Sequence, residues 1–165
     1  MYSADMSAVV TRLFAELVDG TLDPRGAFIL NSGDIGLLRS LDELSPADAS
    51  CSVNDGASIA AHAQHVQIGL SLMNRWAKEG NDPFADPKWD QAWETCGVDA
   101  AQWEQIRSRL RNGSREWLHV LESPRQTTEA ELMGMVGSIA HVAYHLGAIR
   151  QIAKGTRGPR GGTFT

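Results

Sequence analysis

The stretch LMGMVGSIAHVAYHLGAI, residues 132–149, decides the fold class of this chain. Its 18 residues carry no formal charge, and its apolar side chains recur at steps of three and four, which is typical of one face of a helix. The residues on that face are Leu132, Met135, Ile139, Val142, Leu146 and Ile149. A run of this length is at the lower limit for a membrane span, but no aromatic belt or basic cluster marks its ends. We therefore expect a fully buried central helix, with no membrane as a partner.

The remaining segments also have helical rather than strand patterns. Apolar residues at helical spacing predict further helices, and helix-start residues such as Ser45-Pro46-Ala47-Asp48 mark where some of them begin. The main helices are expected over 3–19, 58–78, 99–121 and 128–153, and a shorter one over 33–44. No stretch alternates between apolar and polar residues as a half-buried strand would. The prediction is an all-α four-helix bundle with a long crossover loop between residues 79 and 98.

Length and composition are those of one globular domain. The chain has 165 residues, of which 42% are hydrophobic and 21% are charged, so it can bury a core and is not a disordered chain. We expect a single helical bundle domain over residues 1–153 and a flexible tail, rich in glycine and arginine, over 154–165. The N-terminus has no basic region followed by an apolar one, so we expect no signal peptide and a cytoplasmic location.

Charge and cysteine content exclude several classes of function. With 15 Lys and Arg against 20 Asp and Glu, the net charge is −5, which disfavours a nucleic-acid partner and a polybasic membrane anchor. The two cysteines, Cys51 and Cys96, are too few for a disulfide framework and form no CxxC pair, so a cysteine zinc knuckle is excluded. Arg150 is expected to be a solvated surface arginine.

Four of the five histidines form two pairs at helical spacing. His62 and His65 are three residues apart in HAQH, and His141 and His145 are four apart in HVAYH. Both spacings place two imidazoles on one face of a helix, about one turn apart. Neutral imidazole is the commonest metal ligand in proteins, and helical bundles often build metal sites from facing helices. His141 and His145, with one ligand from the other pair, would leave the fourth position of a zinc ion open for water or substrate.

Other interpretations of these histidines compete with a metal site. Histidines at helical spacing also arise by chance, as partly buried or surface polar groups. A di-iron carboxylate site is disfavoured because it needs Glu-x-x-His on two helices, and none of the four paired histidines stands three residues after a glutamate. The HExxH motif of zinc peptidases does not occur in the sequence. We assign no function to His119, and no catalytic residue stands out.

Two segments resemble the DinB-like (YfiT-type) metal-binding four-helix bundles of bacteria. These segments are SIAAHAQHV, residues 58–66, and SIAHVAYHLGAIRQ, residues 138–151. In that family a lone histidine on the second bundle helix joins an HxxxH pair on the last one, so the resemblance implies that His65, His141 and His145 are the metal ligands. Gly147 also matches, whereas the His-Arg-Gly-Gln that is frequent in the family is replaced by HLGA at 145–148.

The resemblance implies a divalent metal, with zinc or nickel preferred, and chemistry at its open position. Some relatives look like thiol-dependent enzymes, either S-transferases that use a small cellular thiol or an isomerase that uses mycothiol, and many others have no known activity. The expectation is a metal-dependent enzyme that activates water or a small thiol toward an electrophilic small molecule. The alternatives are a non-catalytic metal-binding stress-response bundle and a helical interaction module. A homodimer is compatible with an apolar bundle of this size.

Several further residues keep more than one interpretation. His62 could be a fourth ligand, a partner that orients a ligand, a base near the open position, or a helix-face histidine without function. Trp103 and Trp117 hold the core spacing of their helix, which predicts that they pack in the core. Trp89 and Trp93 could line the mouth of a pocket over the metal, or could clamp the crossover to the bundle.

Overall fold

The computed structural model describes residues 2–21, 27–80, 93–123 and 127–157 and confirms the all-α fold class. Its elements are α1 (Tyr2–Asp19), α2 (Gly36–Asp42), α3 (Pro46–Ala49), α4 (Ile59–Glu79), α6 (Ala100–Glu122), α7 (Glu129–Ile152) and the 3-10 helix η2 (Lys154–Thr156). These ranges contain no strand. The four predicted main helices correspond to α1, α4, α6 and α7 and begin and end close to the expected positions, whereas α2 is shorter than expected.

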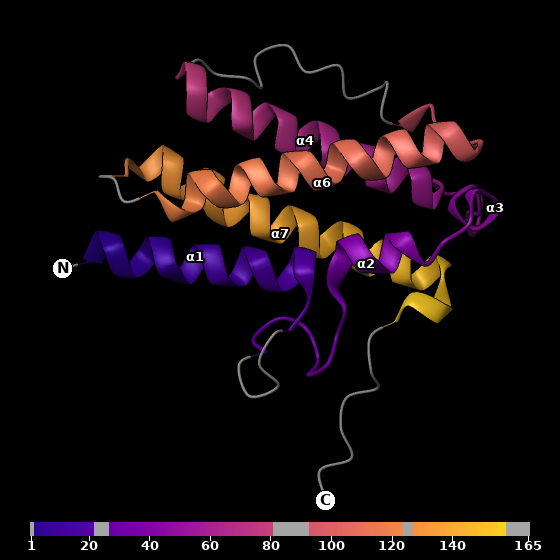
Figure 1. The fold of residues 1–165 in the computed structure, drawn as a ribbon, viewed down its shortest axis with the longest axis horizontal. Helices are drawn as coiled ribbons and strands as arrows, with labels where there is room; N and C mark the ends of the chain where they lie inside the picture. Colours follow the sequence, from indigo (N-terminus) through magenta and orange to yellow (C-terminus); the bar gives the residue numbers. More distant parts are fainter. Residues whose placement is uncertain (1, 22–26, 81–92, 124–126, 158–165) are drawn as a thin grey trace, which may run out of the picture.

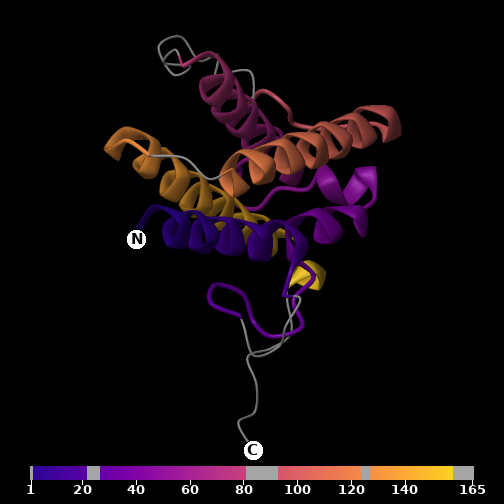
Figure 2. The ribbon, with the colours of Figure 1, turned by 60° about the vertical axis from the view of Figure 1, so that its left-hand side comes forward.

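The four long helices pack along one another. Helix α4 contacts α6 and α7, and α1 contacts α6, α7 and α2. Figure 1 shows that α1 and α7 run in one direction and that α4 and α6 run in the opposite one. Figure 2 shows α6 and α7 between α4 and α1. Helix α6 is the next long helix after α4 in the described part of the chain, and the two run the same way. The end of α4 and the start of α6 therefore lie at opposite ends of the molecule, as the expected crossover requires.

Side-chain caps fix the starts of three long helices. Ser58, Asp99 and Thr128 have extended backbone angles, and each side chain accepts a hydrogen bond from the main-chain N–H three residues later. Helix α4 ends at Gly80, whose φ of 70° lies in the left-handed region that favours glycine. The predicted helix start at Ser45–Asp48 forms a capping box at α3. These caps explain why the helix ends could be located from the sequence.

Trp103 and Trp117 lie in the core, as their spacing predicted. Both are 1% exposed. The indole N–H of Trp103 donates to the Leu44 carbonyl at 3.0 Å, and that of Trp117 donates to Ser138 Oγ at 2.9 Å. Both buried donors are therefore satisfied, and the second bond ties α6 to α7.

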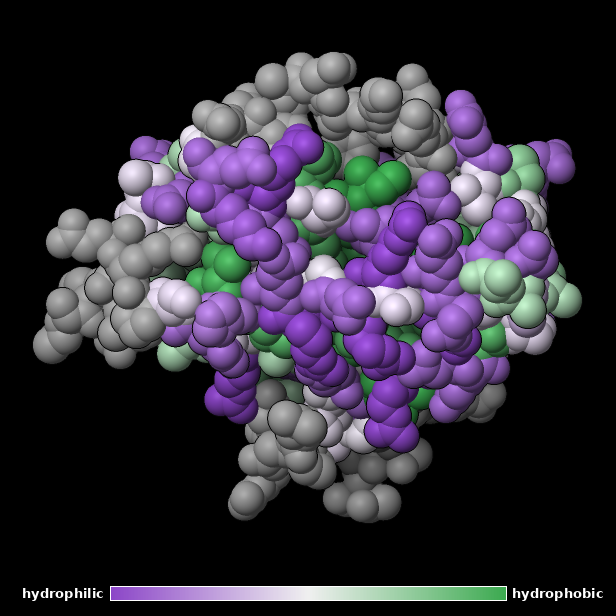
Figure 3. Space-filling view, turned by 45° about the horizontal axis from the view of Figure 1, so that its top comes forward, coloured by the Kyte–Doolittle hydropathy of each residue, from purple (hydrophilic) through white to green (hydrophobic). Residues whose placement is uncertain are grey.

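Figure 3 shows the face formed largely by α4 and α6, on which hydrophilic side chains dominate and hydrophobic surface lies recessed between them.

The expectation of a fully buried central helix is wrong. Met133, Val136 and Tyr144 are 65%, 51% and 71% exposed, and 39% of the most apolar window of α7 is buried. The reason is that apolar residues surround this helix, whereas its neighbours cover only part of its circumference. Within the described ranges, α7 is the one helix long and apolar enough to cross a membrane, a property of length and composition that core helices of water-soluble proteins share.

Arg150 is not a solvated surface arginine, which corrects a second expectation. Its Nη2 lies 2.6 Å from Oδ1 of Asp34, and Asp34 is 3% exposed. The same oxygen accepts the main-chain N–H of Gly36 at 2.8 Å, at the start of α2. A largely buried ion pair therefore links α7 to the segment before α2. The sequence gives no local signal for this pair, because its partners are 116 positions apart.

The packed part of the chain extends beyond the expected domain boundary at residue 153. Lys154–Thr156 form η2, Thr156 is buried, and Arg157 donates from Nε to the Arg150 carbonyl at 3.1 Å. The expected flexible tail therefore does not begin at residue 154. The remainder of that tail, 158–165, lies outside the described residues.

Replacing Arg150 by alanine should lower the free energy of unfolding by about 3 kcal/mol, because it leaves the buried Asp34 carboxylate without its cation. Arg111→Ala is the matched control, since the side chains of its ion pair with Asp42 are 41% and 38% exposed. The control should cost less than about 1 kcal/mol. Urea unfolding followed by circular dichroism measures both losses, and equal losses would contradict a buried, stabilising role for the Arg150 pair.

Candidate metal centre

Two glycines lie where α4 and α7 face each other: Gly69 is beside His141, and Gly134 is about two turns of α7 before it. A methyl group on Gly69 of α4 would lie 3.0 Å from Cε1 of His141, and one on Gly134 of α7 would lie 2.5 Å from Cζ3 of Trp76. Both distances are shorter than the 3.5–4.0 Å or so at which carbon atoms pack. A larger side chain at either position would therefore force the ring of His141 or that of Trp76 to move.

His65, His141 and His145 come together as the family resemblance implied. Each offers one imidazole nitrogen, and the three nitrogens lie within 4.8 Å of one another. The ring centroids are 4.6–5.0 Å apart, and Nε2 of His141 is 3.1 Å from Nε2 of His145. Two nitrogens on one tetrahedral zinc ion, each at about 2.0–2.1 Å from it, would be about 3.3 Å apart. The His141–His145 pair is close to this separation, and the three residues together could hold a divalent metal ion. We call these three residues the histidine cluster.

His62 lies beside the histidine cluster rather than in it. Its Nδ1 is 3.0 Å from Nδ1 of His145, which is the nitrogen of His145 that does not face His141. A neutral imidazole has one N–H and one lone pair. If Nδ1–H of His145 donates to His62, the Nε2 lone pair of His145 faces the cluster. Of the alternatives open for His62, this geometry favours a partner that orients a ligand.

Burial keeps the imidazoles neutral near pH 7. Burial first, and repulsion from protonated neighbouring histidines second, lower the pKa of His145 to about 3 and that of His65 to about 4. Burial also lowers the pKa values of His62 and His141. Neutral imidazole is the form that binds a metal. The histidine cluster is therefore already in its metal-binding protonation state at neutral pH.

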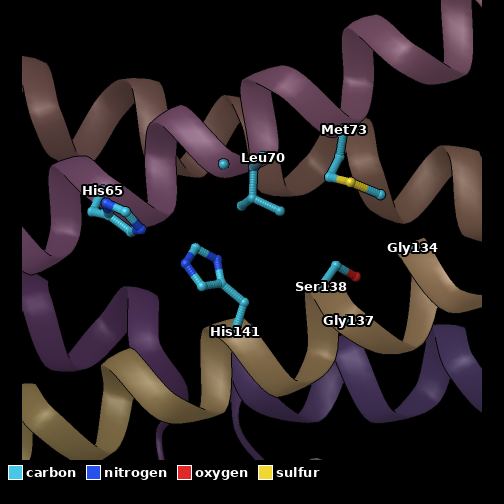
Figure 4. A pocket seen from close by; sticks show the side chains of 8 residues that line it. His65, Leu70, Met73, Gly134, Gly137, Ser138 and His141 are labelled. Atoms are coloured by element: carbon cyan, nitrogen blue, oxygen red, sulfur yellow. The ribbon is translucent and has the colours of Figure 1, made fainter. Parts of the chain in front are cut away.

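A cavity of about 360 Å³ lies beside the histidine cluster, between α4 and α7. Figure 4 shows His65 and His141 at one end of this cavity and Met73 and Gly134 at the other. The described lining residues are His65, Gly69, Leu70, Met73, Gly134, Gly137, Ser138 and His141. A small molecule in this cavity would lie against two of the three residues of the histidine cluster.

Trp93 stacks on the histidine cluster from the crossover segment. Its ring is 4.4 Å from that of His65 at an interplanar angle of 30°, and 5.6 Å from that of His62 in an edge-on arrangement. The side chain remains 41% exposed, so one side of it faces solvent. The structure thus packs Trp93 against the histidines of α4, a contact compatible with both alternatives, and Trp93 is not among the described residues that line the cavity. Trp89, which shared those alternatives, lies outside the described residues.

Two hydrogen bonds fasten the segment after Trp93 to α4. Ser58 Oγ donates to the Thr95 carbonyl at 2.8 Å, and Thr95 Oγ1 donates to Gln64 Oε1 at 2.9 Å. Gln64 is the neighbour of His65, so the same turn of α4 carries a candidate ligand and the anchor of the segment that covers it. Sequence reasoning missed both bonds, because Thr95 is separated from its partners by 37 and 31 positions.

The other residues considered for chemistry lie outside the histidine cluster. His119 is exposed on α6. Cys51 and Cys96 are both free and exposed. None of the three belongs to the described group of residues that could share a metal ion.

No family model, no curated protein and no solved structure matches this chain. The geometry of the histidine cluster is therefore the feature that indicates the class of the site. The likeness to DinB-like bundles rests on the two sequence segments that carry it.

We expect the metal-free protein to lose stability as the pH falls from about 7 to about 4. Histidine in an unfolded chain has a pKa of about 6.5, whereas folding lowers the pKa of His65 to about 4 and that of His145 to about 3. Between these values protons bind preferentially to the unfolded state, so acid favours unfolding. Melting temperatures in chelator-containing buffers measure the effect. The His65→Gln/His145→Gln variant should depend on pH less steeply than His119→Gln, and equal dependence would contradict the expectation.

Proposed function

We propose that this protein is a divalent-metal-dependent enzyme of the DinB-like (YfiT-type) bundle class. His65, His141 and His145 would hold the metal, with zinc or nickel as the first candidates. The observation that carries the proposal is the set of three imidazole nitrogens within 4.8 Å of one another, at the end of a cavity large enough for a small molecule. Because His65 and His141 also line that cavity, a bound substrate would reach the metal.

The residues of the chain would prepare the site for catalysis. Three protein ligands leave a position for water or substrate, as in catalytic rather than structural zinc sites. A divalent metal at this position lowers the pKa of bound water or of a thiol and so supplies a nucleophile near neutral pH. A hydrogen bond donated by Nδ1–H of His145 to His62 would fix the ring of His145, and the ring of Trp93 packs on that of His65.

The reaction we propose is transfer of a small thiol, or of water, to an electrophilic small molecule. His65, His141 and His145 would hold the metal, which would lower the pKa of the thiol so that its proton passes to solvent. The sulfur would then form the new bond to the electrophilic carbon, and the leaving group would depart with the bonding electron pair. Support comes from the two histidine segments, whose likeness is to a family with thiol-dependent members. No general base is assigned, because proton loss from a metal-bound thiol does not need one near neutral pH.

A non-catalytic metal-binding bundle is the second candidate function. It would need a fourth ligand to close the site, and His62 is the nearest imidazole that could provide one. Its Nδ1, however, faces the nitrogen of His145 that points away from His141. His62 would have to give up this contact to bind the metal, which favours the open site.

The remaining expectations concern location and partners. A small thiol and an electrophile are the partners that the proposed reaction needs, and the net charge of −5 makes nucleic acid a poor one. A homodimer would have an apolar surface available on α7, where Met133, Val136 and Tyr144 are exposed. A cytoplasmic location completes the proposal.

Metal content tests the proposal first. The untagged protein, purified without chelator and supplied with zinc or nickel, should contain about one metal ion per chain by inductively coupled plasma mass spectrometry. The His65→Ala/His145→Ala variant should contain almost none, since two of three ligands are lost. His119→Ala is the control that should keep the metal. A metal-free wild type after reconstitution would remove the basis of the proposal.

Replacing His62 by leucine should weaken metal binding about 10- to 100-fold without changing its stoichiometry, because His145 loses the partner that orients it. His62→Asn should recover part of this loss, since its amide oxygen can accept the same hydrogen bond. Competition with a chromogenic chelator measures both affinities. If His62→Leu bound no metal at all, His62 would be a ligand, and if its affinity were unchanged, His62 would have no positioning role.

An exchangeable position distinguishes an enzyme from a closed structural site. In the cobalt-substituted protein, a small thiol should shift the visible absorption bands and add sulfur-to-cobalt charge-transfer intensity in the near ultraviolet, because a thiolate enters the coordination sphere. The spectrum of a closed four-ligand site would not respond. An unchanged spectrum at millimolar thiol would therefore favour the non-catalytic candidate over the enzyme.

A further inference from the structure

The cavity between α4 and α7 has the size and position of a binding site for one small molecule. Its volume of about 360 Å³ falls within the range of about 300–1,000 Å³ that is usual for such sites. It runs from His65 and His141 at one end to Met73 and Gly134 at the other (Figure 4). One end of any occupant would therefore be at the histidine cluster, and the rest of it would lie along the two helices.

The walls of this cavity select an apolar occupant. None of the described lining residues carries a formal charge. Apart from the two histidines, Ser138 provides the one polar side chain among them, and its hydroxyl already donates to the Met135 carbonyl at 2.7 Å and accepts from Trp117 at 2.9 Å. Ser138 has no proton left to donate to a ligand. A charged or strongly polar group placed here would lose its water without gaining a partner, which is costly.

Gly137 lines the cavity at a position where close packing does not require a glycine. A methyl group at Gly137 would meet no atom within 4 Å, unlike one at Gly134 or Gly69. A glycine in a helix interior costs about 1 kcal/mol relative to alanine, and no close contact explains it here. A leucine at this position would add its side chain at the wall of the cavity, where the β-carbon has open space.

We propose that this cavity binds the apolar body, aromatic or branched aliphatic and uncharged, of the electrophilic small molecule, whose polar reacting end lies at the histidine cluster. The position of the polar end at the histidine cluster rests on the proposed function, because it requires the metal. Binding of the apolar body does not rest on the proposed function, since it depends on the cavity walls alone. The proposed electrophile is thus an apolar compound rather than a phosphate, a sugar or an amino acid.

Two metal-binding ligands of different size test the inference on the zinc-loaded protein. Acetohydroxamate reports the metal alone, and 2-naphthohydroxamate adds an aromatic body to the same metal-binding group. Calorimetry should give an affinity at least tenfold higher for the naphthyl compound. In Gly137→Leu this preference should largely disappear, with acetohydroxamate affinity and zinc content unchanged. Gly147→Leu is the matched control, since Gly147 is also an exposed glycine of α7 with open space around it and does not line the cavity.

A neutral dye separates failure of the cavity from failure of the metal site. N-phenyl-1-naphthylamine should fluoresce strongly with the metal-free wild type and with Gly147→Leu, and weakly with Gly137→Leu. If neither hydroxamate binds but the dye does, the metal proposal fails and the apolar site stands. If acetohydroxamate binds, the naphthyl compound has no advantage and the dye does not bind, the inference about the cavity is overturned. A naphthyl preference that survives in Gly137→Leu would overturn it as well.

Discussion

The close approach of α4 to α7 is the constraint on which the site depends. At the present spacing of the two helices, a methyl group on Gly69 would press on the ring of His141 and one on Gly134 on the ring of Trp76, so a larger residue at either position would displace these side chains. That spacing brings the two histidine pairs, each on its own helix, to within a few ångströms of each other. It also forms the walls of the adjoining cavity. The candidate metal centre and the candidate substrate site are thus two consequences of one packing contact.

This arrangement costs free energy because it removes imidazole groups from water. Four histidine rings, one buried and three partly buried, gather here, and burial lowers their pKa values so that all four stay neutral near pH 7. In the metal-free protein the 3.1 Å contact between His141 and His145 requires one ring to donate and the other to accept. A divalent cation between the helices would let both rings present lone pairs. Its binding would therefore stabilise the fold as well as complete the site.

Local signals in the sequence were sufficient for much of the fold. The helix starts expected at residues 58, 99 and 128 coincide with N-caps at Ser58, Asp99 and Thr128, which are contacts between residues three positions apart. Spacing also predicted that each histidine pair shares a helix face. The choice of His65 over His62 came from the family resemblance, and the structure supports it by placing His65 in the cluster and His62 beside it. Whether a metal binds there stays a prediction.

The features that could not be predicted depend on distant contacts. The ion pair of Asp34 with Arg150 and the stacking of Trp93 on His65 join segments whose relation is set only when the helices pack. The exposure of α7 is another such feature, because hydropathy gives the apolar content of a helix but not how much of it its neighbours cover. Each of these failures concerns which surfaces meet, whereas the successes concern spacing within one element.

Anomalous diffraction from crystals of the zinc-loaded protein, measured at the zinc absorption edge, tests the central claim most directly. The account predicts one peak per chain, about 2.0–2.1 Å from one nitrogen each of His65, His141 and His145. Nδ1 of His62 should remain hydrogen-bonded to Nδ1 of His145, and the fourth coordination position of the zinc ion should hold a water molecule. The absence of a peak at the histidine cluster would contradict the claim that this fold builds an open, three-histidine metal centre. A zinc ion with His62 as its fourth ligand would contradict it as well.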